Sequence, residues 1–175
     1  TYWYPWFSDD LVTFSMKVQL PQGWKAISQG GRATTKRATA QSANKNRSKK
    51  TYFCKFEEQN PQDEIYLIAG KFTEYSRQAG PVQTLVFLRN PDEKLANKYL
   101  ETGSQYIKMY SKLLGPYPYK KFALIENFWQ TGYGMPSFAL LGSKIIRFPF
   151  ILHSSYPHEI LHNWWANGVF VDFSS

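Results

Sequence analysis

The chain has 175 residues, enough for one ordinary domain or for one small domain and part of another. Hydrophobic residues make up 43% of it and aromatic residues 18%, which excludes a chain that is disordered throughout. The longest apolar stretches are far shorter than a membrane span, so no transmembrane segment is expected. Residues 1–20 lack the basic-then-apolar pattern of a signal peptide, and because the sequence starts at Thr1 we expect a fragment or a processed product.

Most of the net charge of +8 comes from one segment. Between Arg32 and Lys50 there are seven Lys or Arg residues and no acidic residue. Such a run could contact nucleic acid, but it contains no aromatic residue to stack on a base, and a solvated loop or exposed hairpin is the simpler interpretation. No nucleic-acid partner is therefore expected. Cys54 is the only cysteine, which excludes an internal disulfide and a cysteine cluster for zinc.

The first 80 residues are predicted to be β-structure. Residues 11–20 alternate between apolar and polar side chains, which is typical of a half-buried strand, and a second strand is predicted at 24–28. Two more strands are expected at residues 51–56 and 64–76, separated by a polar segment. We place a domain boundary at Gly80-Pro81, because both residues interrupt regular structure.

Beyond this boundary, strands and helices alternate. A strand at 83–89 is followed by a helix that residues 90–93 open, because proline and acidic residues favour the first helical turn. Gly115-Pro116 ends this helix. Apolar side chains recur near helical spacing along it: Leu95, Tyr99, Tyr106, Met109, Tyr110 and Leu113.

The last third of the chain carries a glycine-rich segment at residues 129–142. Strands are predicted on either side of it, at 121–127 and 144–148. A final helix begins at residues 154–155, where either serine can cap it, and ends at residues 167–168.

This final helix contains the stretch PHEILHNWWANG, residues 157–168. His158 and His162 are four residues apart, which corresponds to about 400° of helical rotation, so both side chains project from the same face. Their imidazoles can then reach one zinc ion at about 2 Å each. Glu159 points about 100° away, where it can take a proton from a water without being a ligand. The spacing is that of the His-Glu-x-x-His zinc peptidases.

The alternative is that both histidines are ordinary core or surface residues. Ile160, Leu161, Trp164 and Trp165 form a separate apolar stripe, so packing does not require the histidines. Catalytic zinc normally takes three protein ligands. His153 is not expected to be the third, and Asp172, the one carboxylate after His162, is not favoured either.

These residues, together with GPYPYKKFALIENFWQTGYGMPSFALLG, resemble the gluzincin zinc metallopeptidases of the aminopeptidase N (membrane alanyl aminopeptidase) family, and in particular bacterial members that carry Gly-Tyr-Gly-Met-Pro. The resemblance is strong over residues 81–175 and weaker over residues 1–80. It implies an α+β chain in which residues 1–80 end an N-terminal antiparallel β-domain and residues 81–175 begin a thermolysin-like catalytic domain.

The resemblance also implies zinc as cofactor, with His158 and His162 as ligands and Glu159 as general base. The third ligand of the family is a glutamate about 18 or 19 residues after the second histidine, which is expected past Ser175 together with the transition-state tyrosine.

One segment departs from the family pattern. The family usually has Gly-Ala-Met-Glu-Asn, whose glutamate binds the free amino terminus of the substrate, but here Pro136 takes the place of that glutamate. Proline cannot pair with an ammonium group and has no amide hydrogen to donate. The candidate substrate-binding residues are Gly132, Tyr133, Gly134 and Met135, where the glycines let a peptide backbone come close. A plain turn between strands is the alternative for this segment.

The leading hypothesis is a zinc-dependent metallopeptidase that hydrolyses peptide or protein substrates with a zinc-activated water. The alternative is a non-catalytic peptide-binding or scaffold protein on the same fold. The 175-residue chain by itself is expected to bind zinc weakly and to catalyse little. The sequence leaves open whether the activity is that of an exopeptidase or an endopeptidase, as well as the compartment and the oligomeric state.

Overall fold

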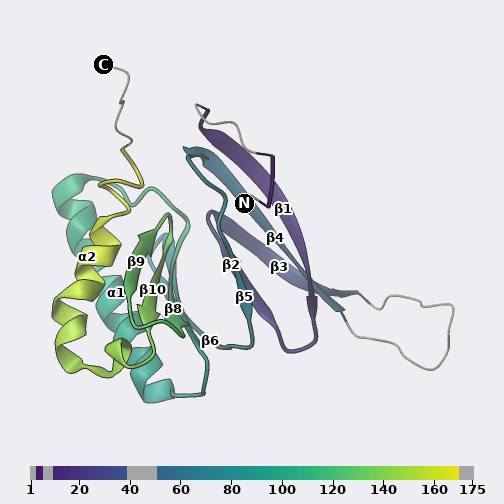
Figure 1. Cartoon of the computed structure of the whole chain (residues 1–175). Coiled ribbons are helices and arrows are strands. Elements are labelled where there is room, and N and C mark those ends of the chain that lie inside the picture. Colours follow the sequence, from purple (N-terminus) through teal and green to yellow (C-terminus); the bar gives the residue numbers. More distant parts are fainter. Residues whose placement is uncertain (1–2, 6–9, 39–50, 170–175) are drawn as a thin grey trace, which may run out of the picture.

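The computed structural model describes residues 3–5, 10–38 and 51–169. Within these residues the fold is mixed α+β, with mostly strands and two α-helices. Figure 1 shows its layers: a three-stranded sheet on the right, a two-stranded sheet in the middle, and a five-stranded sheet with the helices on the left. No helix among the described residues has the length and apolar character needed to cross a membrane.

The three-stranded sheet is antiparallel and has the order β1-β4-β3. Strand β1 (Val12–Pro21) alternates between half-buried and exposed side chains, as predicted for a strand with one covered face. It pairs with β4 (Thr51–Gln62), which pairs in turn with β3 (Gly31–Ala38). The first part of the basic run is therefore a strand, and residues 39–50 lie outside the described residues.

Two predictions in this half of the chain are wrong. Strand β4 continues through the polar segment after residue 56, because its ladder with β1 extends to Gln62 and buries Glu58. Residues 64–76 do not form one strand but parts of two, β5 (Leu67–Gly70) and β6 (Thr73–Ala79). They separate because β5 pairs with β2 (Lys25–Ser28), whereas β6 pairs with a strand of the next sheet.

The five-stranded sheet has the order β6-β7-β8-β10-β9. Its three inner strands are parallel: β7 (Val82–Leu88), β8 (Lys121–Asn127) and β10 (Phe138–Gly142). Both outer strands, β6 and β9 (Gly132–Met135), are antiparallel to their neighbours. Gly80, with φ of 63°, lies in the turn of the β6–β7 hairpin. The sheet therefore begins at Thr73, before the predicted boundary.

Helix α1 (Glu93–Leu114) begins and ends as predicted. The Asp92 side chain accepts a hydrogen bond from the Leu95 amide at 2.9 Å, and Gly115, with φ of 106°, ends the helix. The helix buries a stripe of five residues: Ala96, Tyr99, Leu100, Gly103 and Ile107. Met109 and Leu113 are exposed, because they lie outside the stripe that faces the sheet.

The chain after β10 differs from the prediction in two respects. Residues 144–148 do not form a strand. The 3₁₀-helix η1 (Ile145–Arg147) lies there instead, with Ile146 buried in the core and Ile145 packed against it, and η2 (Pro149–His153) follows. Helix α2 (Ser155–Leu161) ends at Leu161 and gives way to turns, six residues before the predicted end. The Ser154 hydroxyl does not cap it, since it donates to the Phe150 carbonyl at 2.9 Å.

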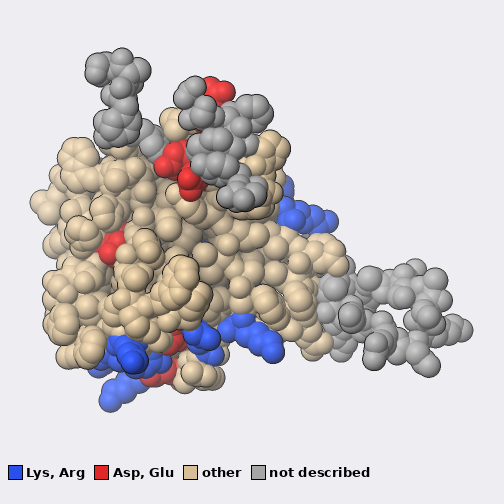
Figure 2. Space-filling model, viewed as in Figure 1, with Lys and Arg blue, Asp and Glu red and all other residues tan. Residues whose placement is uncertain are grey.

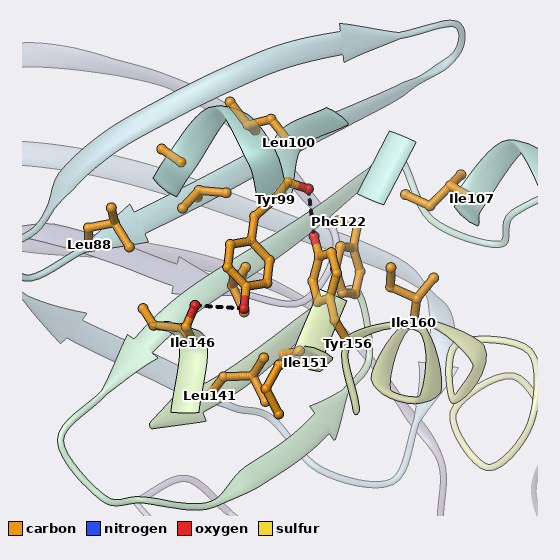
Figure 3. Close-up of a cluster of buried hydrophobic side chains, with 14 of the residues drawn as sticks. Leu88, Tyr99, Leu100, Ile107, Phe122, Leu141, Ile146, Ile151, Tyr156 and Ile160 are labelled. Atoms are coloured by element: carbon orange, nitrogen blue, oxygen red, sulfur yellow. Dashed lines mark hydrogen bonds between the residues drawn. The ribbon is translucent and has the colours of Figure 1, made fainter. Parts of the chain in front are cut away.

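Helices α1 and α2 cover one face of the five-stranded sheet. Figure 3 shows Tyr156 and Ile160 of α2 pointing toward Phe122 of β8, with the Tyr156 hydroxyl donating to the Tyr99 carbonyl at 3.2 Å. The β2–β5 pair covers the other face of the sheet, with Ile27 against Phe87 and Phe138. One side of helix α2 thus packs against the core, and the residues of the candidate site lie on its other side.

Candidate metal centre

The two histidines of α2 lie on the side of the helix away from the core. Tyr156 and Ile160 are fully buried, whereas His158 is exposed and His162 is half-buried. Ile160 and Trp164 pack on the core as expected, but Trp165 is 61% exposed and does not belong to the apolar stripe. The separation of packing residues from histidines on one short helix follows from its period of about 3.6 residues.

The imidazoles of His158 and His162 lie side by side with their Nε2 atoms within hydrogen-bond distance of each other. Their Nε2 atoms are 3.1 Å apart, and the ring planes are inclined at 84°. Two nitrogen ligands at about 2.0–2.1 Å from a tetrahedral zinc ion would be separated by about 3.3 Å. The pair therefore has close to the spacing that two ligands of one zinc ion need.

Glu159 lies beside this pair in a more protected position. Glu159 is only 8% exposed. Burial raises the pKa of its carboxyl group above the ordinary value, while the nearby His162 and His158 act to lower that pKa. A carboxylate with a raised pKa accepts a proton more readily than one in water. This environment suits a general base.

Strand β9 lies directly against these side chains. A Cβ atom built on Gly134 would be 2.7 Å from Oε2 of Glu159 and 2.8 Å from Cδ2 of His162. A Cβ built on Gly132 would be 3.0 Å from Oε1 of Glu159. A side chain at either position would force Glu159 or His162 to shift, so the two glycines let β9 lie close to the candidate metal centre.

The other two candidate substrate-binding residues point elsewhere. Tyr133 alternates with the glycines along the strand and is 45% exposed, while Met135 packs against the second core cluster with Phe138. Strand β9 is the last strand of the sheet in the described part of the chain. Its backbone therefore has one side that is not paired with β10. Pro136 lies in the turn between β9 and β10, outside the ladder.

The described residues supply two candidate metal ligands but not a third. Among them, no group of three or more His, Cys, Asp or Glu side chains is arranged to hold a metal ion. His153 lies in η2 with its Nδ1 atom 3.4 Å from the Tyr106 hydroxyl, and Asp172 lies outside the described residues. Cys54 is buried in the three-stranded sheet, where burial raises the pKa of its thiol.

Three buried polar residues near the site do not stand out in the sequence. Asn163 follows the second histidine, Ser137 follows Pro136, and Lys121 opens β8. A signal for Lys121 does exist, because it shares one side of β8 with Ala123 and Ile125, both of which are buried. Asn163 similarly lies four residues after Glu159, on a side of the chain that the core covers.

Charge is distributed away from the metal centre. Figure 2 shows Lys and Arg side chains gathered along the lower edge of the molecule, while the surface over α2 and β9 is mostly uncharged. Arg32, the first cation of the basic run, donates to both carboxylate oxygens of Glu74, at 2.7 and 3.2 Å. One positive charge of the run is thus neutralised within the protein.

No protein-family model matches the chain, and no curated protein matches it.

Proposed function

We propose that this chain carries two zinc ligands, His158 and His162, and the general base, Glu159, of a zinc metallopeptidase. The observation that supports the proposal best is the convergence of the two Nε2 atoms to 3.1 Å on the open side of α2. In this proposal the β-structure before Thr73 ends an N-terminal antiparallel β-domain, and the five-stranded sheet that begins at Thr73 opens a thermolysin-like catalytic domain.

Each group in the proposed site has a chemical role. When bound, zinc would lower the pKa of a water molecule and polarise the carbonyl group of the scissile bond. Glu159 would accept a proton at its carboxylate from the attacking water and then donate it to the departing amine. Gly132 and Gly134 would let β9, and a substrate strand paired with it, lie close to Glu159.

The substrate class follows from the position of β9. A terminal strand can add one extended peptide through main-chain hydrogen bonds, and this peptide would then lie beside the histidine pair. We therefore propose a peptide or protein as the substrate. The aminopeptidase specificity of the family is the less supported part, because Pro136 stands where an ammonium-binding glutamate is expected.

A second candidate function is a non-catalytic peptide-binding or scaffold protein. The same terminal strand favours it, since β9 could bind an extended peptide without any metal. The two functions separate on whether the histidine pair binds zinc and whether Glu159 is needed for hydrolysis.

The experiment that tests the proposal is a calorimetric titration of the chain with Zn²⁺. We expect saturable binding of one ion, weakened about tenfold or more in His158→Gln and His162→Gln because each loses a ligand. His153→Gln is the matched control and should bind as the unaltered chain does. Equal affinities in His162→Gln and His153→Gln, or no binding of zinc, would contradict the proposal.

Catalysis needs a separate measurement. Glu159→Gln should keep zinc binding and should lose any zinc-dependent peptide hydrolysis that the chain shows, because the amide cannot accept the proton. Full hydrolysis by this variant would remove Glu159 as the base. Binding of an extended peptide by a chain that does not bind zinc would favour the second candidate.

A further inference from the structure

Strand β9 has to be held close to Glu159 and His162, yet its own sheet supports it weakly. It has four residues, it is the last strand in the order, and β10 is its neighbour. Short terminal strands fray readily because half of their backbone groups lack a partner strand. Contacts from outside the sheet are therefore needed to keep the strand in place.

The turn that connects β9 to β10 is itself strained. Met135 pairs with Phe138, so Pro136 and Ser137 form a two-residue loop. Ser137 has φ of 68°, a left-handed conformation that disfavours a residue with a Cβ. The usual two-residue hairpin turns place glycine or asparagine at the position with positive φ. This loop places a serine there. A strained loop of this kind persists only where surrounding contacts hold it.

Ser137 has such contacts at each of its polar groups. Its amide donates to Oδ1 of Asn163 at 2.8 Å, and its carbonyl accepts from the Ala123 amide at 3.1 Å. Its hydroxyl oxygen lies 2.8 Å from Nζ of Lys121, which donates to it. Ser137, Asn163 and Lys121 are all buried.

Both partners of Ser137 are themselves anchored. The amide nitrogen of the Asn163 side chain donates to the Ile160 carbonyl of α2 at 2.9 Å, and its Oδ1 atom also accepts from the Tyr117 hydroxyl at 3.1 Å. Lys121 also donates to the Ser28 carbonyl of β2, at 2.7 Å. The Ser137 network, consisting of Lys121, Ser137 and Asn163, thus connects α2, the β9–β10 turn, β8 and β2.

We propose that Lys121 and Asn163 are positioning residues that hold Ser137, and through it strand β9, at the distance from Glu159 and His162 that the metal centre requires. A lysine beside a serine hydroxyl could also suggest a nucleophilic pair, but both side chains are buried and Lys121 is only 2% exposed, so no substrate can reach them. That these hydrogen bonds serve a metal centre rests on the proposed function. That they hold β9 in place can be tested independently of it.

The test is hydrogen exchange of the β9 amides in the 175-residue chain. Lys121→Met and Ser137→Ala should each speed exchange in residues 132–135 about five- to tenfold, since each removes the buried hydrogen bond between Lys121 and Ser137; Lys121→Met also removes the bond to the Ser28 carbonyl. Lys120→Met, at the exposed neighbouring lysine, is the matched control and should leave β9 unchanged. Exchange in β1 and β4 reports any general loss of stability and should change less than exchange in β9.

A rescue by side-chain chemistry makes the test specific. Asn163→Asp keeps the acceptor for the Ser137 amide, whereas Asn163→Leu has a similar size and offers none. We expect the nuclear Overhauser effect between the Gly134 Hα atoms and the His162 ring to persist in Asn163→Asp and to weaken in Asn163→Leu. Should Asn163→Leu not fold, Ser137→Ala and Lys121→Met decide the question by the same signal.

The proposal is overturned if β9 in Lys121→Met and Ser137→Ala exchanges as it does in Lys120→Met, or if the signal between Gly134 and His162 is the same in all variants. Zinc titration of the unaltered chain provides a separate readout. If zinc does not bind but β9 is released in these variants, the proposed function fails while the network stands.

Discussion

At the scale of single residues, the candidate site depends on two glycines, because a residue without a Cβ atom lets β9 lie close to Glu159 and His162. Gly132 and Gly134 alternate along β9 and face the Glu159 carboxylate, and Gly134 also faces the His162 ring. The helical period sets the spacing of the two histidines, whereas the two glycines allow the short distance between α2 and β9. The candidate metal ligands and β9 therefore lie close together because the two glycines have no Cβ atom.

Gly134→Ala should weaken zinc binding. Its Cβ atom would lie 2.7 Å from Glu159 and 2.8 Å from His162, so the histidine ring has to move away from the position in which it faces His158. Overpacking of this kind costs about 1–3 kcal/mol, which corresponds to a loss of affinity of about 5- to 150-fold. The measurement is the zinc titration described above.

Gly31→Ala is the matched control for this prediction. Its added Cβ would be 3.4 Å from the Lys120 side chain and 3.9 Å from the Glu57 carbonyl, and these are ordinary contacts. We expect zinc binding close to that of the unaltered chain. If both glycine variants bind zinc equally well, β9 does not constrain the ligands.

At the scale of the elements, α2 is short and keeps its orientation through α1. Gly103 of α1 lies where the Tyr156 hydroxyl of α2 approaches, and a Cβ built on Gly103 would be 2.6 Å from that oxygen. The Tyr99 and Tyr156 rings pack edge to face with centroids 4.8 Å apart. A helix of seven residues has little stability by itself, so its contacts with α1 and with the sheet hold it in the orientation in which the histidines face away from the core.

Gly103→Ala should destabilise the protein, although alanine is the better helix former. The propensity gain is about 1 kcal/mol, whereas the close contact with Tyr156 costs about 1–3 kcal/mol and displaces α2. We expect a lower midpoint in urea unfolding and a weaker zinc affinity. Gln105→Ala, at an exposed position of the same helix, is the control and should be neutral or slightly stabilising. A Gly103→Ala variant that is more stable than the unaltered protein would refute this account of the helix contact.

At the scale of the whole molecule, the buried Lys121 connects the layers through the Ser137 network. Burial lowers the pKa of its ammonium group to about 7, with Glu58 acting to raise it and Arg32 to lower it. In the unfolded chain the same group titrates near about 10.4. Between these two values the unfolded state binds more protons, so stability increases as the pH rises through this window.

The free energy of unfolding should therefore rise from about pH 7 to about pH 9. Above about pH 10 it should fall again, because burial raises the pKa of Tyr117 and Tyr156 and the unfolded chain then loses its phenolic protons first. Urea unfolding at several pH values measures this profile. Lys121→Met should flatten its rising part, and Lys120→Met should not. A rise of equal slope in Lys121→Met would exclude Lys121 as its source.

Much of the fold could be predicted from local patterns. The alternation in β1 and the capped start and glycine end of α1 depend on neighbouring residues, and the structure confirms them. The 3₁₀-helix at Ile145–Arg147 could not be predicted, because a short apolar run has no period that distinguishes a strand from a helical turn. The continuation of β4 through Glu58 was missed for a similar reason, since pairing with β1 outweighs a polar composition.

The candidate site, like the fold, has some features that neighbouring residues determine and others that depend on residues far apart in the sequence. The common face of His158 and His162, and the place of Glu159 beside it, follow from the helical period and could be predicted from the sequence by itself. The closeness of β9 and the Ser137 network could not, because Lys121, Ser137 and Asn163 meet only when β8, the β9–β10 turn and α2 are packed together. Sequence therefore determined which side chains can share a metal ion, and tertiary packing decided what lies against them.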